Sequence, residues 1–357
     1  MERVMIPSYV VKEYDTAQEL YAKHDFAGAA KICFNLLTGN SNSEDLNYFM
    51  SAIARQRGNL HAALHSAFKA HLINNNSVKN LIALSEISYD MGDYEQALIF
   101  VEAAKKIDSG HLRVIAIQVR INLKLKLIDV AETYLAEYEK RDVAQSEKDH
   151  LRLEFELQKT WLLTACKEQQ LLNKTDEMFK IVSDCLSTNE KNYLIVKAQS
   201  SKLLRGTIIG HDQLASISTE TRRANILSLN ITPESKKIYE SVYTAVLKTS
   251  TDLGVKLSGP AGPLQLTEYL STELGFYDWH IDTGIGAYKK RAISISILLS
   301  NSNDFTGGEL ILLIDGKLKP MQLSAGDAVI FKSNTQHCVS EVRNGIRYSL
   351  VGWFDVA

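Results

Sequence analysis

The N-terminal half of the chain repeats itself every 34 residues. At this period a bulky apolar residue recurs, and an alanine follows it three residues later: the pairs are Phe26 with Ala29, Leu60 with Ala63, Tyr94 with Ala97 and Ile128 with Ala131. A period of this length corresponds to one helical hairpin, which cannot bury its apolar face alone and must stack on its neighbours. The small alanine lets the two helices of a hairpin approach closely. The repeat therefore predicts a stack of helical hairpins.

The third repeat carries the clearest pattern, because residues 92–98 read Gly-Asp-Tyr-Glu-Gln-Ala-Leu. The region resembles tetratricopeptide repeats, although the tryptophan and the late proline of the ideal repeat are missing. We expect a repeat domain over residues 13–200, with four hairpins and a degenerate fifth pair spanning residues 146–186. Such a right-handed α-solenoid has a concave face that usually binds an extended peptide or another protein. In the alternative reading, the helices brace the second domain or form a homodimer.

The C-terminal half reads as a small β-barrel. Residues 292–299, 309–314 and 328–331 are short apolar or alternating runs of the kind that forms strands. Turn signals separate them: residues 304–308 read Asp-Phe-Thr-Gly-Gly and residues 315–316 read Asp-Gly, which favour turns with positive φ. These segments predict a double-stranded β-helix. Ahead of them, Thr232 and Pro233 open a predicted helix that extends to Leu253.

His280, Asp282 and His337 have the residue types of a metal site with two histidines and one carboxylate. Non-haem Fe(II) oxygenases use this ligand set and leave coordination positions open for other ligands. Residues two apart on a strand share a side, so His280 and Asp282 can both turn inward at a strand end. Arg347 lies ten residues after His337, on a strand that we expect to pair beside that of His337. A guanidinium holds a carboxylate bidentately, and Ser349 can add a hydroxyl on the same side.

These residues belong to a longer ordered pattern. The pattern comprises Tyr269, Gly275, Tyr277, His280-Ile281-Asp282, Arg291, Leu298-Leu299-Ser300, Gly307-Gly308-Glu309-Leu310, Gly326-Asp327-Ala328-Val329-Ile330-Phe331, His337, Val342, Gly345, Arg347, Ser349 and Trp353. With these motifs in this order, residues 201–357 resemble the 2-oxoglutarate and Fe(II)-dependent dioxygenases of the prolyl 4-hydroxylase type.

The resemblance implies a cofactor, two cosubstrates and a reaction. His280, Asp282 and His337 would hold Fe(II), and Arg347 would bind the C5 carboxylate of 2-oxoglutarate, whose C1 carboxylate and keto oxygen chelate the iron. With O2, the cosubstrate decarboxylates to succinate while a substrate C–H bond is hydroxylated. Ascorbate is a further candidate cofactor. Asp282 also indicates hydroxylation over halogenation, because relatives that halogenate have a small residue at that position.

The sequence departs from the family at one position. Many relatives have a tyrosine that helps to hold 2-oxoglutarate on the strand after the His-x-Asp motif, and this chain has Leu298 there. Tyr269 or Ser294 could supply the missing hydrogen bond. We favour Tyr269, because the family often has a tyrosine facing the cosubstrate in that upstream region.

Composition bounds the remaining possibilities. The formal net charge of −2 gives no bulk electrostatic case for nucleic acid or an anionic membrane as a partner. No apolar run approaches the length of a membrane span, and residues 1–7 lack the apolar stretch of a signal peptide. The four cysteines are scattered without metal or disulfide spacing, which suits a reducing cytoplasm. We therefore expect a cytoplasmic protein.

Three hypotheses follow for function. The first is a dioxygenase that hydroxylates an aliphatic C–H bond of a protein or peptide residue bound through the repeats. Proline is the first candidate, because helical repeats also accompany the barrel in collagen prolyl hydroxylases, an argument by analogy. The second is a hydroxylase of a free amino acid or a carrier-bound biosynthetic intermediate, a small-molecule substrate, with the repeats used for dimerisation or docking. The third is a repeat-based adaptor whose barrel is catalytically inactive.

Overall fold

The protein is described by a computed structural model covering residues 8–168, 177–206, 208–209, 215–216, 218–284 and 286–357. Contacts divide the chain into two compact units. The first contains Met1–Asp142 with Ile209–Ser216, and the second contains Val143–Ile208 with Ile217–Ala357. We call the second unit the barrel unit.

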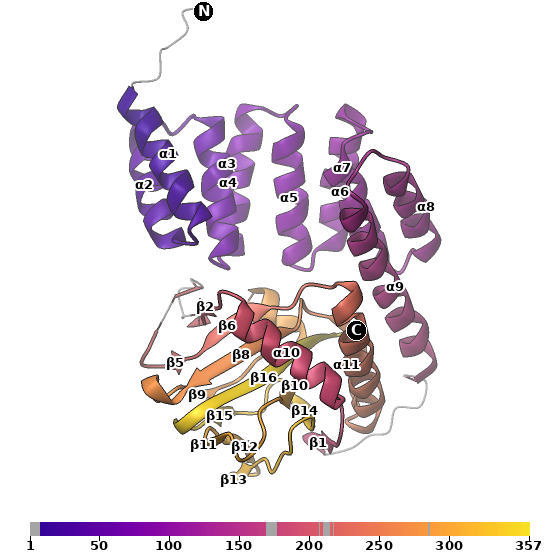
Figure 1. The fold of residues 1–357 in the computed structure, drawn as a ribbon. Helices are drawn as coiled ribbons and strands as arrows, with labels where there is room; N and C mark the ends of the chain where they lie inside the picture. The colour runs from indigo at the N-terminus through magenta and orange to yellow at the C-terminus, as the bar shows by residue number, and fades with distance from the viewer. Residues whose placement is uncertain (1–7, 169–176, 207, 210–214, 217, 285) are drawn as a thin grey trace, which may run out of the picture. The chain divides into compact units, whose positions relative to one another are not determined.

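Within the described residues, the first unit contains the four hairpins expected from the repeat (Figure 1). The helices pair in chain order: α1 (Ser8–Ala22) with α2 (Phe26–Gly39), α3 (Glu44–Gln56) with α4 (Leu60–Ile73), α5 (Val78–Asp90) with α6 (Tyr94–Ile107), and α7 (Leu112–Lys124) with α8 (Ile128–Glu139). The 34-residue period is confirmed as the hairpin period, because the four recurring apolar residues are the first residues of α2, α4, α6 and α8.

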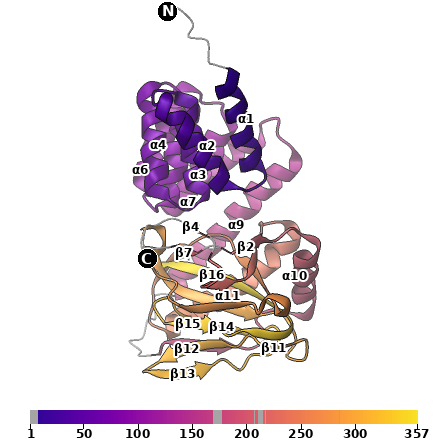
Figure 2. The same cartoon turned by 90° about the vertical axis from the view of Figure 1, so that its left-hand side faces the viewer.

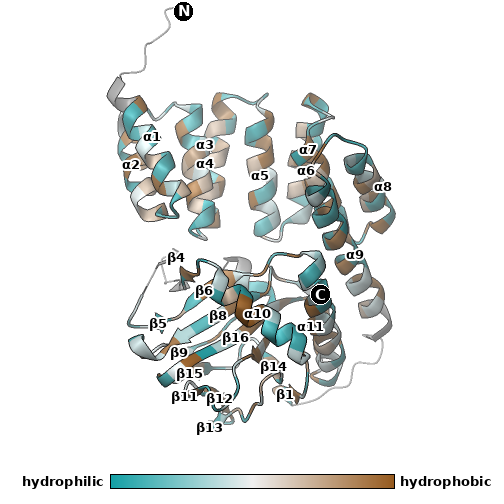
Figure 3. Cartoon of the chain, viewed as in Figure 1, coloured by the Kyte–Doolittle hydropathy of each residue, from teal (hydrophilic) through white to brown (hydrophobic). Residues whose placement is uncertain are grey.

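The turn inside each hairpin also repeats. Two residues before the second helix begins, the backbone takes a positive φ at His24, Gly58, Gly92 and Lys126. The alanine three residues into each second helix is fully buried, which confirms its role as a close-packing position. Figure 3 shows hydrophobic and hydrophilic residues alternating along these helices, as expected where one face of each helix packs against its neighbours.

The predicted fifth hairpin is wrong. Residues 145–168 form one long helix, α9 (Gln145–Glu168), and Phe179–Val182 is a strand, β1, paired with a strand of the barrel unit. Helix α9 belongs to the barrel unit, and Trp161 joins it to the rest of that unit: the Trp161 ring stacks on Phe354 with centroids 5.2 Å apart and meets Tyr243 edge-on at 5.3 Å. We had expected the domain boundary at residue 201, whereas the compact units divide after Asp142.

The barrel unit is built on two antiparallel sheets (Figure 2). In the described part of the chain the larger sheet has nine strands: β1, β2 (Leu204–Arg205), β6 (Asn225–Ser228), β7 (Leu257–Pro260), β8 (Gln265–Leu270), β10 (Arg291–Leu298), β11 (Phe305–Gly307), β14 (Ala328–Lys332) and β16 (Val342–Val356). The smaller sheet has five: β5 (Arg222–Arg223), β9 (Phe276–His280), β12 (Leu310–Ile314), β13 (Lys317–Pro320) and β15 (His337–Val339). Outside both sheets, β3 (Ile208–Ile209) pairs with β4 (Ala215–Ser216), and residues 209–216 belong to the first unit.

The expected strands and the double-stranded β-helix are confirmed. The three predicted runs are β10, β12 and β14, shifted by a residue at their ends. A buried cluster joins the sheets, with Tyr269 and Phe331 from the larger one and Leu312 and Val339 from the smaller one. Short helical segments connect strands at Ser271–Glu273 and Gly286–Lys290.

Two longer helices complete the barrel unit. The predicted helix is α11 (Pro233–Asp252), capped by the side chain of Thr232. It places Val242 and Val246 in the core, and it packs against α9 and β10. Helix α10 (Thr188–Ser200) begins at a capping box formed by Ser187 and Glu190. None of the described helices is both long and apolar enough to cross a membrane.

Candidate metal centre

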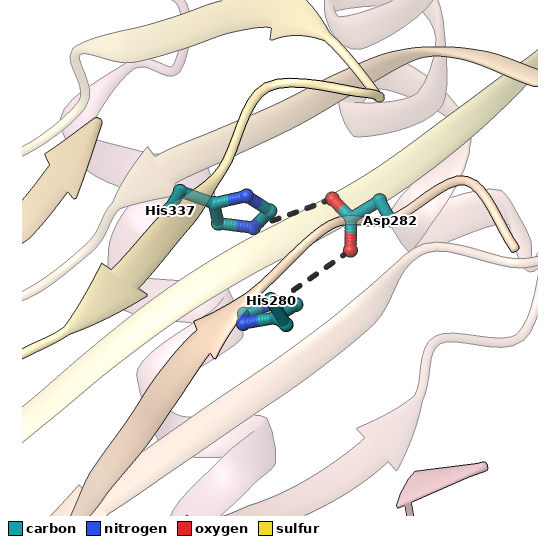
Figure 4. A group of neighbouring side chains, drawn as sticks. All are labelled: His280, Asp282 and His337. Atoms are coloured by element: carbon teal, nitrogen blue, oxygen red, sulfur yellow. Dashed lines mark ion pairs between the residues drawn. The ribbon is translucent and has the colours of Figure 1, made fainter. Parts of the chain in front are cut away.

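The structure brings His280, Asp282 and His337 together (Figure 4). One ligand atom from each lies within 4.8 Å of the others. The Nε2 atom of His280 is 3.7 Å from Oδ1 of Asp282, and Nε2 of His337 is 3.5 Å from Oδ2. The two imidazole Nε2 atoms and the two carboxylate oxygens of Asp282 therefore converge on one place, although the three residues come from separate segments of the chain.

Strand pairing in the smaller sheet accounts for this convergence. His280 ends β9 and His337 begins β15, and the two residues are direct partners in the antiparallel pairing of these strands. Asp282 lies just beyond the end of β9, and its backbone N–H donates to the carbonyl of Ser333 across 2.9 Å. The carboxylate is therefore placed by the turn that directly follows the strand end, where we had expected both side chains to turn inward.

Hydrogen bonds fix which imidazole nitrogens face the centre. Nδ1 of His280 is 2.7 Å from the Asp278 carbonyl, and Nδ1 of His337 is 2.9 Å from the Thr335 carbonyl. A carbonyl oxygen only accepts, so each Nδ1 carries the proton and each Nε2 has a free lone pair. Metal-binding histidines are commonly oriented by a backbone carbonyl in this way. The three residues thus fit a divalent cation of the Fe(II) class.

The electrostatics of the cluster agree with this assignment. Burial and the neighbouring His337 lower the pKa of the His280 imidazole. Burial also opposes ionisation of Asp282, but His337, His280 and the Ser294 hydroxyl outweigh it, and the pKa of this carboxyl lies below its ordinary value. His280 is thereby held neutral and Asp282 ionised, which are the forms that bind a cation.

Aromatic rings hold the two histidines in place. The Tyr277 ring stacks on His280 with centroids 3.6 Å apart, and the guanidinium carbon of Arg222 lies 4.6 Å from the centre of the same tyrosine ring. Phe331 meets His337 edge-on at 4.8 Å. Tyr277 therefore packs against one of the candidate metal ligands.

Arg347 lies on the larger sheet, so its expected pairing beside the His337 strand is wrong. Its strand, β16, pairs with β10 and β8, whereas β15 pairs with β12 and β9. Arg347 is only 2% exposed, and among the described residues it forms no ion pair. One guanidinium nitrogen donates to Oγ of Ser349 across 2.9 Å, and the Tyr269 ring centre is 5.4 Å away. Burial lowers the pKa of this guanidinium.

The Gly-Gly turn makes room for this arginine. Gly308 has a φ of +65°, and a Cβ atom at this position would stand 2.8 Å from Cδ of Arg347. Both the backbone conformation and the close approach require glycine. A motif that first indicated a turn therefore also leaves space for the arginine side chain.

The other two expected site residues occupy different places. Tyr269 lies beside Arg347, opposite it in the pairing of β8 with β16. The Ser294 hydroxyl donates instead to Oδ2 of Asp282 across 2.7 Å and lies 2.9 Å from the Ser333 hydroxyl. Ser294 thus contacts one candidate metal ligand, Asp282, and makes no hydrogen bond with Arg347 among those described.

Four residues near the site had been given no role in it from the sequence: Thr267, Arg291, Tyr288 and Trp353. Thr267 contacts Ser349. Arg291 lies between two rings, with its guanidinium carbon 4.0 Å from the centre of Tyr288 and 4.1 Å from that of Trp353, and its buried Nε has no hydrogen-bond partner among the described residues. Arg291 and Trp353 both stand in the ordered motif pattern, so their place in that pattern was a usable signal.

Comparison with known proteins finds its family match in the part of the chain that contains the candidate metal centre. Residues 264–355 match the model of the 2OG-Fe(II) oxygenase superfamily. A PKHD-type hydroxylase of Synechococcus sp. (strain CC9902) is 33% identical over 79 residues, which are 22% of this chain and 36% of the relative. A PKHD-type hydroxylase of Prochlorococcus marinus (strain MIT 9301) is 30% identical over 132 residues, 37% of this chain and 59% of that protein. The matches thus cover less than two thirds of these curated relatives.

Solved structures that resemble the chain include a prolyl hydroxylase from Trichoplax adhaerens in complex with a fragment of hypoxia inducible factor. That structure has a TM-score of 0.43 and 21% identity, and the match covers 57% of this chain and 93% of the other. A prolyl-4-hydroxylase from Pseudomonas putida has a TM-score of 0.40 and 18% identity, with 54% and 98% covered.

Proposed function

We propose that this protein, whose residues 264–355 form a 2OG-Fe(II) oxygenase domain, is an Fe(II)- and 2-oxoglutarate-dependent hydroxylase. It would hydroxylate an aliphatic C–H bond of a protein or peptide residue, with proline the first candidate, while 2-oxoglutarate and O2 yield succinate and CO2. The observation that carries the proposal is the meeting of three metal-ligand side chains in a barrel that also buries an arginine without a carboxylate partner among the described residues.

In this proposal His280, Asp282 and His337 hold Fe(II). The iron would supply the activation of O2 and the oxidation of the C–H bond, while the protein binds, orients and excludes water. Both histidines present Nε2 because their Nδ1 protons are used by backbone carbonyls. Ser294 holds the Asp282 carboxylate through a hydrogen bond to Oδ2.

Arg347 binds the far carboxylate of 2-oxoglutarate in this proposal. A buried guanidinium carries a large desolvation cost unless an anion compensates it. Its described partners are the Ser349 hydroxyl and the Tyr269 ring, neither of which is an anion. A carboxylate bound there would use the remaining N–H donors in charge-assisted hydrogen bonds.

Arg291 is the residue that we expect to face the substrate. Its guanidinium lies near enough to Asp282 to lower the pKa of that carboxyl, and its Nε lacks an acceptor among the described residues. Such a group could donate to a peptide carbonyl. The helical repeats add a surface of the kind that binds extended peptides.

The same arginine also favours a second candidate substrate. A guanidinium binds a carboxylate strongly, so Arg291 could select the carboxylate of a free amino acid. A carrier-bound intermediate would lack that group. In this reading the repeats would serve for dimerisation or docking.

The test is succinate formation from 2-oxoglutarate by the Fe(II)-loaded protein, with and without proline-containing peptides or free amino acids. Mass spectrometry should find a gain of one oxygen in the stimulating substrate. His280→Ala and Asp282→Ala should abolish turnover, whereas His65→Ala, at an exposed position of α4, should not. Unchanged turnover in the His280 variant would contradict the proposal. If the protein bound neither iron nor 2-oxoglutarate, a repeat-based adaptor would be favoured.

A further inference from the structure

A pair of buried hydroxyls, those of Thr267 and Ser349, lies beside Arg347. We call these three side chains the anion pocket, after the carboxylate that is proposed to bind to Arg347. Oγ1 of Thr267 is 2.6 Å from Oγ of Ser349, and Ser349 in turn accepts a hydrogen bond from Arg347. Thr267 and Ser349 are each 1% exposed. Water therefore does not compete for these hydroxyls, and their protons must be used within the protein or by a ligand.

The sheet explains why Thr267 is the neighbour of Ser349. Three strands run side by side here, and the residues facing each other across them are Leu298 on β10, Ser349 on β16 and Thr267 on β8. Residues opposed in this way point to the same face of a sheet. One neighbour of Ser349 is thus apolar, and the other carries a hydroxyl.

The donors and acceptors of these three side chains determine whether the Ser349 hydroxyl proton is available to a ligand. Arg347 can only donate, so Oγ of Ser349 accepts from it. Either hydroxyl can donate in the 2.6 Å contact between Thr267 Oγ1 and Ser349 Oγ. Without a ligand, Ser349 can donate to Thr267 while Thr267 donates to the Ser349 carbonyl at 3.3 Å. With an acceptor beside the guanidinium, Thr267 can donate to Oγ of Ser349 instead. With both bonds made, Ser349 Oγ has accepted two hydrogen bonds. Its own proton is then free for an acceptor beside the guanidinium.

We propose that Thr267 is a positioning residue of the anion pocket, which turns the Ser349 hydroxyl so that it donates to the carboxylate held by Arg347. The inference rests on the proposed function, because it takes the far carboxylate of 2-oxoglutarate as that anion. Hydroxyls bonded in series polarise one another, so the Thr267 bond also strengthens the donation from Ser349. The Ser349 hydroxyl thereby becomes a neutral hydrogen-bond donor beside Arg347. Its strand neighbour Leu298, where many relatives have a tyrosine, offers no hydroxyl.

The test uses full-length protein loaded with Mn(II) without O2, so that 2-oxoglutarate binding is measured by calorimetry without turnover. Thr267→Val removes the hydroxyl and retains a residue that suits a strand. We expect it to weaken 2-oxoglutarate binding about five-fold, and Thr267→Ser to restore binding. Thr249→Val, at a buried threonine of α11, is the matched control and should leave binding unchanged.

Two further measurements separate positioning from general structural damage. With Fe(II), O2 and a stimulating substrate, Thr267→Val should raise the KM for 2-oxoglutarate and leave kcat near the wild-type value. Ser349→Ala should weaken binding roughly ten-fold, and adding Thr267→Val should then cost little more, because both changes remove the same interaction.

The possible failures are distinguishable. If wild-type protein does not bind 2-oxoglutarate, the proposed function itself is overturned. If wild type binds it and Thr267→Val binds equally well, or if the two substitutions are fully additive, only the role of Thr267 is overturned.

Discussion

The hydroxyl of Ser294 donates a hydrogen bond of 2.7 Å to Oδ2 of Asp282. Ser294 lies on β10 of the larger sheet, and Asp282 follows β9 of the smaller sheet, so a residue of one sheet orients a candidate metal ligand beside the other. Partners of this kind typically contribute a factor of 10 to 100 in metal affinity. We expect Ser294→Ala to weaken Mn(II) binding about ten-fold, measured by metal titration without O2.

Ser296 provides the matched control for this change. It lies two residues further along β10, is also buried and makes no contact with Asp282 among the described hydrogen bonds. Ser296→Ala should bind Mn(II) as wild type does. Equal losses in both variants would mean that the strand, not the hydrogen bond, determines the affinity.

Arg347→Met should separate stability from ligand binding. The guanidinium is buried without an anion in the described residues, and methionine has a similar volume without the charge. Replacing buried charges by apolar side chains often raises stability by about 1–4 kcal/mol. We expect the free energy of unfolding of the ligand-free protein to rise, and the rise in Tm caused by 2-oxoglutarate to disappear. A variant that is less stable and still responds to 2-oxoglutarate would contradict this.

Trp161→Ala should destabilise the barrel unit. The Trp161 ring is 1% exposed and lies between α11 and β16, where it contacts Tyr243 and Phe354. Truncating a large buried aromatic side chain typically costs about 3–5 kcal/mol. Chemical denaturation should show this loss, whereas Leu163→Ala, at a position of the same helix that is 53% exposed, should change stability little. An unchanged midpoint for Trp161→Ala would mean that α9 is not part of the barrel unit.

Leu127→Asp should stabilise the repeats. Helices α2, α4 and α6 are capped by side chains of Asp25, Asn59 and Asp93, whereas Leu127 stands at the same place before α8 and offers no acceptor. The φ and ψ angles of Leu127, −90° and 67°, are close to those of Asp93, −93° and 78°. An aspartate should therefore form the missing cap and add about 1 kcal/mol. Thermal unfolding checks this, with Asp93→Ala expected to shift Tm in the opposite direction.

The elements that follow local patterns were predictable from the sequence. The 34-residue period located the helix starts at Phe26, Leu60, Tyr94 and Ile128, because hairpin packing repeats with the chain. The alternating runs and Gly-rich turns gave β10, β12 and β14, and the motif order selected the residues of the metal centre. Where a tertiary contact overrode the local signal, prediction failed: residues 145–168 became one helix and residues 179–182 a strand, both in the barrel unit.

Residue identity alone determined which side chains could bind a metal or a carboxylate, because only certain groups have that chemistry. The tertiary structure decided how they are placed. Pairing of β9 with β15 sets His280 against His337 across 57 residues of sequence, while Arg347 lies on the other sheet. The tertiary structure also brought Ser294 into contact with Asp282, and Thr267 into contact with Ser349. Those contacts depend on the register between distant strands, and register follows from the packing of the whole barrel, not from the residues of one strand.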